Sequence, residues 1–202
     1  MQAEKIRKNV VLYFGSFNPV HNGHFGLVNY LIDNNLTREL WFVVSPRNPL
    51  KLQAGLIDEN LRIEMVRLAI GENLLLQASD IEFFMPKPSY TVDTLQVLQT
   101  KFPNTDFSLL TGSDNALVFN KWKDYKTILK RVEVLVYPRE SYDFQKVAHV
   151  FPQMKLLADA PVFEISSTQI RDELARGKTA LARKWLQPKI LDFILKNNLY
   201  CN

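Results

Sequence analysis

Residues 9–24 read NVVLYFGSFNPVHNGH, and they carry the strongest structural signal in the chain. The apolar run 10–14 is typical of a buried strand, which breaks at Gly15 and gives way to a helical pattern from Gly23. A buried strand that turns into a helix places backbone N–H groups at the helix N-terminus, where the partial positive charge favours anions. His21 and His24 lie three residues apart on the opening turn and point the same way. The stretch therefore favours polyphosphate binding, and nucleotide chemistry is the leading hypothesis.

Two other interpretations of the histidines stay open at this point. His21 can be a helix cap and His24 a surface residue. A zinc pair is the second alternative, but zinc needs a third or fourth ligand. Beyond these two histidines the sequence holds only His149 and Cys201 as nitrogen or sulfur ligands. We therefore expect no protein-held metal cluster, and Gly23, which allows close approach to the backbone, favours the phosphate interpretation.

Length and composition indicate one domain, 1–202, with a helical C-terminal subregion at about 165–202. The 202 residues are 47% hydrophobic, enough for a full core, and the net charge of +4 suits anionic small molecules. The single cysteine cannot form an internal disulfide, which indicates a reducing compartment. No stretch resembles a signal peptide or a membrane span. We expect a cytoplasmic protein with no membrane partner, and the sequence leaves homo-oligomerisation open.

A basic stretch with interleaved aromatic residues is the one sign of nucleic-acid binding. It comprises Lys121, Trp122, Lys123, Tyr125, Lys126, Lys130 and Arg131. A solvated helix face explains the same pattern, and we favour that interpretation. No nucleic-acid partner is expected.

Short apolar runs rich in β-branched residues alternate with helical patterns along the chain. The predicted strands are 10–14, 40–45, 74–78, 106–110, 132–137 and 155–157. The predicted helices are 23–33, 59–70, 91–101, 113–119, 125–130, 144–150, 167–176, 180–186 and 189–196. This alternation predicts an α/β fold of the Rossmann-like, doubly wound kind: a mostly parallel sheet with helices on both faces and a helical C-terminal tail.

Three segments should meet where the strand order of such a sheet reverses. They are the loop after the first strand, the segment 111–115 after the fourth, and the helix that opens at Ser166. The chain has neither a Gly-x-Gly-x-x-Gly fingerprint nor a P-loop, so dehydrogenases and P-loop kinases become less favoured.

The segment 164–171, EISSTQIR, closes the predicted site. Ser166 and Gln169 match a capping box, which by itself explains a helix start. Arg171 is harder to explain structurally, because a cation near the positive end of a helix is unfavourable unless an anion is bound there. We expect Arg171 to face phosphate oxygens, with Ser167 and Thr168 donating beside it.

Taken together, these motifs resemble the nucleotidyltransferases with a His-x-Gly-His signature, and among them the bacterial nicotinate mononucleotide adenylyltransferases. The matching segments cover nearly the whole chain in the same order. They are 15–19 with 21–24, Pro88-Ser89-Tyr90-Thr91, Gly112-Ser113-Asp114, Trp122, and 165–168 with Arg171. The first and last segments identify the superfamily strongly, and the middle ones select the subfamily more moderately.

The resemblance implies transfer of AMP from ATP to the 5′-phosphate of nicotinate mononucleotide, which gives deamido-NAD and pyrophosphate. The attacking phosphate monoester has a second pKa of about 6, as in phosphorylated side chains, so it is mostly ionised at pH 7 without a general base. Catalysis then consists of positioning and of neutralising charge on the α-phosphate and the leaving pyrophosphate.

The resemblance also implies the roles of individual residues. The catalytic residues are His21, His24 and Arg171, with His24 facing the α-phosphate in the transition state. The ATP-binding residues are Gly15, Ser16, Phe17, Lys51, Gly112, Asp114, Ser166, Ser167 and Thr168. The residues for nicotinate mononucleotide are Asn18, Tyr90, Thr91 and Trp122, whose ring stacks on the pyridine. Mg²⁺ is implied as a cofactor bound mainly through the ATP phosphates.

Three alternatives are kept. A nicotinamide mononucleotide adenylyltransferase would accept the amide in place of the acid, and the two substrates differ in the partners they need from the pocket. A non-catalytic nucleotide-binding module would bind without turnover. An RNA-binding basic domain would show steep salt dependence.

Overall fold

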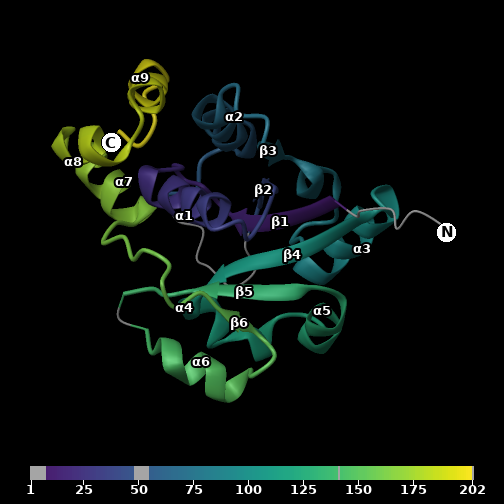
Figure 1. Ribbon diagram of the computed structural model, residues 1–202. Coiled ribbons are helices and arrows are strands. Elements are labelled where there is room, and N and C mark those ends of the chain that lie inside the picture. The colour runs from purple at the N-terminus through teal and green to yellow at the C-terminus, as the bar shows by residue number, and fades with distance from the viewer. Residues whose placement is uncertain (1–7, 48–54, 141, 202) are drawn as a thin grey trace.

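The fold is a six-stranded, fully parallel sheet with helices on both faces (Figure 1). A computed structural model describes residues 8–47, 55–140 and 142–201. The strand order is β3-β2-β1-β4-β5-β6. The strands are β1 (Lys8–Gly15), β2 (Glu39–Val44), β3 (Leu76–Ser79), β4 (Thr105–Gly112), β5 (Glu133–Tyr137) and β6 (Lys155–Leu156). The predicted doubly wound α/β class is confirmed, with all strand pairs parallel.

Helices connect the strands and extend the chain beyond the sheet. They are α1 (Asn22–Asp33), α2 (Glu59–Ile70), α3 (Thr91–Lys101), α4 (Ser113–Ala116), α5 (Tyr125–Arg131), α6 (Phe144–Val150), α7 (Ser167–Ala175), α8 (Ala180–Trp185) and α9 (Pro188–Lys196). Two short 3₁₀ helices are η1 (Ile81–Phe84) and η2 (Phe119–Lys121). Among the described residues, none of these helices is both long and apolar enough to cross a membrane.

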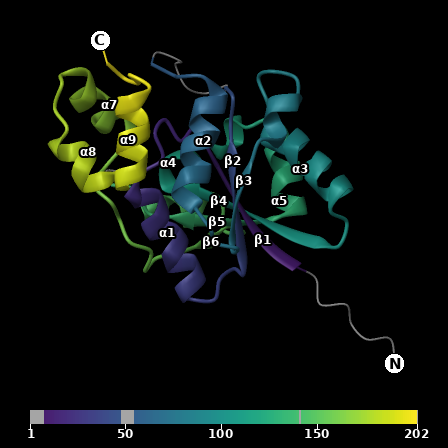
Figure 2. The same ribbon diagram turned by 90° about the horizontal axis from the view of Figure 1, so that it is seen from above.

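The sheet is buried on both faces because its central strand β1 has an unbroken apolar run from Val10 to Phe14. In β1, Val11 and Tyr13 pack in one core cluster, while Val10 and Leu12 pack in the other. This alternation follows from the two-residue period of a strand. The first cluster lies under α1, α2 and the C-terminal helices α7, α8 and α9, and the second under α3, α5 and α6, as the two ribbon views show (Figures 1 and 2).

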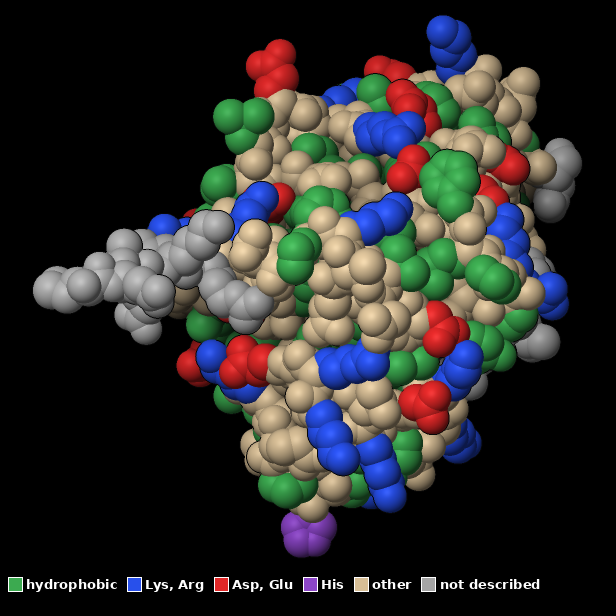
Figure 3. All heavy atoms as spheres, turned by 90° about the vertical axis from the view of Figure 1, so that its right-hand side faces the viewer, with side chains coloured by type: hydrophobic (Ala, Val, Ile, Leu, Met, Phe, Trp, Pro, Cys, Tyr) green, Lys and Arg blue, Asp and Glu red, His purple; other side chains and the backbone are tan. Residues whose placement is uncertain are grey.

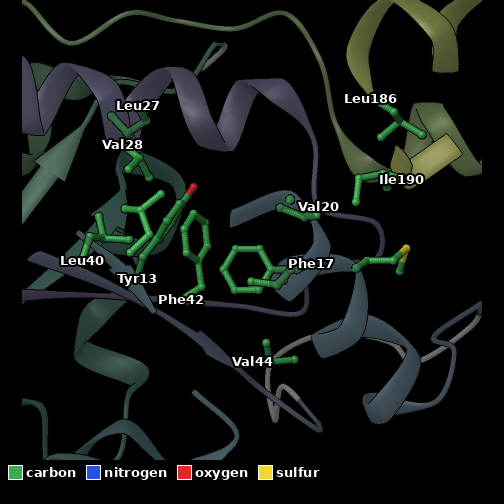
Figure 4. Packing of buried hydrophobic residues seen from close by; sticks show 14 of the residues in the cluster. Tyr13, Phe17, Val20, Leu27, Val28, Leu40, Phe42, Val44, Leu186 and Ile190 are labelled. Carbon is green, nitrogen blue, oxygen red and sulfur yellow. The ribbon is translucent and has the colours of Figure 1, made fainter. Parts of the chain in front are cut away.

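Aromatic rings fill the first cluster close to the end of β1. Phe17 and Phe42 meet edge to face, with ring centroids 5.3 Å apart, and Tyr13 lies 5.6 Å from Phe17 (Figure 4). Val20 packs beside Phe17 in the same view. The core therefore reaches to the loop that follows β1.

Two predicted boundaries are wrong for local reasons. The third strand begins at Leu76 and not at 74, because the Asn73 side chain accepts from the backbone N–H of Leu75 and forms a turn, leaving Leu74 94% exposed. The predicted helix 113–119 ends at Ala116, and the chain then tightens into η2, which places Phe119 in the second core cluster. The other predicted elements agree with the structure to within about two residues.

The order of the strands reverses at β1. From β1 the chain proceeds to β2 and β3 on one side and then returns to β4, β5 and β6 on the other. Ligands of such sheets bind beyond the carboxyl ends of the strands at this reversal. The ends of β1 and β4 therefore mark the region in which to look for a site.

Candidate active site

The two histidines lie side by side where the loop after β1 enters α1, with their rings inclined by 36°. His21 directly precedes α1 in an extended conformation, and its backbone N–H donates to Nδ1 of His24 over 3.1 Å. Since this Nδ1 accepts, a neutral His24 ring carries its proton on Nε2, which can donate. The two ring centroids lie 3.7 Å apart. His21 is thus both the residue at the helix cap and one half of the predicted pair.

Phe17 shapes the loop in front of the histidines. It adopts a positive φ of 46°, and its ring is buried and meets His24 edge to face at 5.2 Å. A Cβ on Gly15 would lie 2.8 Å from this ring. Glycine is therefore needed at position 15 so that the Phe17 ring can turn back over the end of β1.

The fully buried side chain of Arg62 binds the backbone of the loop after β1. Arg62 in α2 donates to the carbonyl oxygens of Ser16 (2.7 Å), Ser45 (2.8 Å) and Pro46 (3.0 Å). Burial lowers the pKa of Arg62 from its ordinary value, yet arginine stays charged in proteins. The Arg62 guanidinium thus joins the loops after β1 and β2. The sequence pattern around Arg62 predicts only a helix and does not indicate this role.

Helix α7 docks onto the histidine loop from a distant part of the chain. The predicted capping box is confirmed, because Ser166 N–H donates to Gln169 Oε1 over 2.7 Å while Gln169 N–H donates back to Ser166 Oγ. The Ser167 hydroxyl donates to the carbonyl of Pro19 over 2.9 Å. The start of α7 is therefore held against the loop that precedes α1.

Arg171 is fixed at this junction. Its Nη1 donates to the carbonyl of Asn18 over 2.8 Å, and its Nη2 donates to the Thr168 hydroxyl over 3.2 Å. A guanidinium has five N–H donors, of which these bonds use two. The arrangement leaves the planar fork oriented for an anion beside the loop.

A cavity of about 260 Å³ lies between β1, α1 and α7, and we call it the histidine cavity. It contains all three residues predicted to be catalytic, His21, His24 and Arg171. The predicted ATP-binding residues Gly15, Ser16, Phe17, Ser166, Ser167 and Thr168 also line it. The structure therefore brings together segments about 150 residues apart around one space rich in hydrogen-bond donors.

Burial keeps His21 neutral. Desolvation first, and the nearby Arg139 guanidinium second, lower the pKa of His21 from 6.5 to about 3. His21 is only 6% exposed. In the free protein at neutral pH, this ring is therefore an uncharged imidazole.

This shift predicts a pH dependence of stability. A depressed histidine pKa contributes stability above the unfolded value of 6.5, and that contribution is lost as pH falls toward about 3. Between pH 7 and pH 5 we expect His21 to account for about 2 kcal/mol of lost unfolding free energy. Urea unfolding at both pH values should show a smaller loss in His21→Gln than in the unaltered chain. His149→Gln is the control, because His149 is exposed, and equal losses in all three proteins would contradict the assignment.

Arg139 is a site residue that the sequence analysis missed. It follows the carboxyl end of β5, lines the histidine cavity, and its Nε lies 3.7 Å from Oδ1 of Asp114. A Cβ on Gly112 would lie 2.4 Å from this Asp114 oxygen and 3.0 Å from Cγ of Arg139. The sequence signal that could have identified Arg139 is its position directly after a predicted strand.

Gly112 and Asp114, two further residues predicted to bind ATP, lie beside the histidine cavity and not in its lining. Neither is among the lining residues of the cavities described here, since the Asp114 and Arg139 side chains fill the space next to Gly112. Asp114 acts on the cavity through its ion pair with Arg139.

A second cavity of about 120 Å³, which we call the tryptophan cavity, lies beyond the ends of β1, β2 and β4. Tyr90, Thr91 and Trp122, three residues predicted for the acceptor substrate, line it. The Trp122 ring lies 4.7 Å from the Phe119 ring, inclined by 30°. Trp122 is half-buried, so its ring is partly accessible.

The floor of the tryptophan cavity contains a buried carboxylate. Glu82 in η1 accepts from the hydroxyls of Ser89 and Thr94, both over 2.7 Å. Burial raises the pKa of Glu82, and these hydroxyls oppose the shift. Glu82 ties η1 to the segment before α3 and so fixes the Tyr90 and Thr91 backbone. The sequence analysis did not predict η1 or this residue.

Lysines from the basic stretch contribute to this cavity. Lys121 and Lys123 line it, and Lys123 pairs with Asp93 over 2.8 Å and lies 4.8 Å from the centroid of the Tyr90 ring. On the face carrying α3 and α5, basic side chains are interspersed with acidic and apolar ones (Figure 3). The structure thus gives two of these lysines a place beside a small-molecule cavity.

The two cavities adjoin one another. Phe14, Gly15 and Asn115 line both. Four buried polar atoms around them have no hydrogen-bond partner within residues 8–47, 55–140 and 142–201. They are His21 Nδ1, Asp114 Oδ1, Trp122 Nε1 and Arg139 Nε. Because native proteins satisfy nearly all buried polar atoms, this grouping marks a ligand site.

Two predicted binding residues remain. Asn18 lies in the histidine cavity and not in the tryptophan cavity, and its side chain is engaged by Gly55 and Tyr200. Its predicted contact with the acceptor nucleotide stays a prediction. Lys51 lies outside the described residues.

Comparison with known proteins gives one consistent picture. A cytidylyltransferase-like family model matches residues 12–173. A protein of Flavobacterium johnsoniae, described as a probable nicotinate-nucleotide adenylyltransferase, is 42% identical over 190 residues, which cover 94% of this chain and 97% of that protein. A Bacteroides fragilis protein with the same description is 42% identical and covers 92% of this chain and 90% of its own length.

A solved structure resembles the whole fold. Nicotinic acid mononucleotide adenylyltransferase of Plasmodium falciparum, complexed with NaAD, superposes with a TM-score of 0.80 at 22% identity. The match covers 96% of this chain and 97% of the other. At this identity the likeness establishes the fold.

Proposed function

The chain belongs to the cytidylyltransferase-like family, and we propose that it is a nicotinate-nucleotide adenylyltransferase. An oxygen of the 5′-phosphate of nicotinate mononucleotide attacks the α-phosphorus of ATP. The bond from this phosphorus to the oxygen that bridges it to the β-phosphate breaks, and its electron pair leaves with pyrophosphate. The products are deamido-NAD and pyrophosphate, and the reaction is a step of NAD biosynthesis.

One observation carries the proposal: a donor-rich cavity adjoins an aromatic cavity at the end of the central strand. His21, His24 and Arg171 surround the first cavity, which suits a triphosphate. Trp122 and Tyr90 line the second, which suits a planar ring. Since Gly15 belongs to both linings, an acceptor phosphate and the α-phosphate can meet there.

Charge neutralisation is the work of the chain's own residues. His24 donates from Nε2 because its Nδ1 is engaged by the loop backbone. Arg171 offers a planar fork that can hold two phosphate oxygens. No residue needs to remove a proton, because the attacking phosphate is already ionised at neutral pH. Donors fixed before the reaction begins stabilise the developing charge most effectively.

The residues fit a magnesium ion that arrives on ATP. The histidine cavity presents mainly donors and cations, and the nearby carboxylate of Asp114 is paired with Arg139. Within the described part of the chain, no three His, Cys, Asp or Glu side chains form a metal cluster. Mg²⁺ carried by the ATP phosphates would supply charge neutralisation of the leaving group, and Asp114 is a carboxylate beside the cavity that could help to hold it.

A tryptophan substitution tests the acceptor site. Trp122→Ala should raise KM for nicotinate mononucleotide about ten- to fifty-fold, because stacking of a ring on an aromatic side chain contributes about 1–3 kcal/mol. KM for ATP should change less than about two-fold. Trp122→Phe keeps a stacking surface and serves as the matched variant. Steady-state kinetics that show equal changes in both KM values would contradict the placement.

Pyrophosphate release tests the function itself. The protein with ATP and Mg²⁺ should release pyrophosphate when nicotinate mononucleotide is added, and kcat/KM should be higher for this acid than for nicotinamide mononucleotide. A higher value for the amide would identify the amide-specific alternative, since exchange of a carboxylate for an amide alters affinity by a few kcal/mol, about two orders of magnitude. ATP binding without pyrophosphate release would identify a non-catalytic module.

A cytoplasmic location fits the expected reducing compartment and completes the proposal.

A further inference from the structure

Asn18 connects three distant parts of the histidine cavity. Its side-chain Nδ2 donates to the carbonyl of Gly55 over 2.8 Å, and its backbone carbonyl accepts from Arg171 over 2.8 Å. Its side-chain Oδ1 accepts from the Tyr200 hydroxyl over 2.9 Å. Asn18 is 3% exposed. Asn18 is therefore part of the cavity wall, and the groups that orient its side chain affect the shape of that wall.

Tyr200 reaches Asn18 from the opposite end of the chain. It follows α9 in a left-handed conformation with φ 62°, and its side chain is partly buried. The hydroxyl lies near the guanidinium groups of Arg171 and Arg62. Burial raises its pKa above the ordinary tyrosine value despite these cations. The phenol is thus protonated at neutral pH and able to donate.

We propose that Tyr200 is a positioning residue for the phosphate site: its hydroxyl fixes the Asn18 amide, and Asn18 in turn fixes Arg171. This inference rests on the proposed function for the identity of the ligand, the ATP triphosphate. Tyr200 does not line the histidine cavity, so it acts through Asn18.

The direction of each hydrogen bond supports this chain of contacts. The Tyr200 hydroxyl donates, so the Asn18 oxygen must face it and the amide NH₂ must face Gly55. With the amide held at both ends, the Asn18 backbone carbonyl keeps one position relative to Arg171. Gly55 itself lies next to the guanidinium, since a Cβ there would be in ordinary contact, 3.6 Å, with Nε of Arg171.

Removal of one oxygen atom tests the proposal. Tyr200→Phe should lower kcat/KM for ATP about ten-fold, because a buried acceptor loses its donor and the Arg171 fork loses its fixed support. KM for nicotinate mononucleotide should stay within about two-fold, because its ring lies in the other cavity. Tyr30→Phe, which removes a hydroxyl near the far end of α1, is the matched control.

A double-mutant cycle separates positioning from general stability. In an Arg171→Ala background, Tyr200→Phe should change kcat/KM for ATP less than about two-fold, because its effect acts through Arg171. An equal loss in both backgrounds, or no loss in Tyr200→Phe alone, would overturn the proposal. Thermal unfolding of each variant confirms that the assays use folded protein.

Calorimetric ATP binding keeps this test independent of turnover. Tyr200→Phe should weaken ATP binding about ten-fold even if no pyrophosphate is released. If the unaltered chain released no pyrophosphate, the proposed function would be contradicted. Unchanged ATP affinity in Tyr200→Phe would instead contradict the role of Tyr200.

Discussion

His24→Ala is expected to lower kcat for pyrophosphate release by about 10²- to 10³-fold, the loss typical when one preorganised donor is removed from a developing oxyanion. The donor is Nε2, since the backbone N–H of His21 binds Nδ1 and holds the ring in one tautomer. The adjacent His21 and Phe17 rings restrict rotation of the His24 ring. The ring therefore needs little reorganisation when charge develops on the α-phosphate.

Binding measurements sharpen this prediction. ATP affinity should fall less than the rate, because an interaction made mainly in the transition state affects kcat more than ground-state binding. His149→Ala removes an exposed imidazole on α6 and should leave the rate unchanged. If His24→Ala keeps the full rate, the assigned mechanism is wrong.

Arg171→Ala is expected to lower kcat/KM for ATP by about 10²- to 10³-fold. The substitution removes a cation from the triphosphate and also removes the donor to the Asn18 carbonyl. Loss of a charged hydrogen-bond partner at a partly buried site costs about 3–4 kcal/mol, which corresponds to this range. Steady-state kinetics with ATP as the varied substrate measure it.

Two further variants show which property of Arg171 matters. Arg171→Lys keeps the charge but loses the planar fork, so it should recover only part of the lost activity. Arg176→Ala, after the last turn of α7, should leave kcat/KM within about two-fold, because Arg176 is exposed and pairs with Glu173. A large loss in Arg176→Ala or full activity in Arg171→Lys would contradict a fork-shaped phosphate contact.

The segments that sequence patterns predicted best are those with local signals. The β1 pattern, the glycine at its end and the histidine spacing are all readable within 16 consecutive residues. The capping box of α7 is equally local, and it formed as expected. Convergence of β1 and α7 followed from the general rule that ligands bind where strand order reverses.

What the sequence did not reveal depends on contacts between distant residues. Asn18 sits in a recognisable loop, but its partner Tyr200 is 182 positions away. Arg139 pairs with Asp114 in α4, which follows the neighbouring strand β4. Glu82 accepts hydrogen bonds from the hydroxyl of Ser89, which precedes α3, and from that of Thr94 within α3. Composition and periodicity carry no record of such pairings, so the contacts of the Asn18 side chain with Gly55 and Tyr200 could not be predicted.

His21, His24 and Arg171 are expected to face one triphosphate. The most direct measurement is a titration of the ¹⁵N-labelled protein with ATP and Mg²⁺, following the imidazole nitrogens and Nε of Arg171 by NMR. We expect the signals of His21, His24 and Arg171 to shift together at one ATP affinity, while the exposed His149 signal stays in place. Saturating ATP binding, measured in parallel by calorimetry, that leaves the signals of both site histidines unmoved would contradict the account.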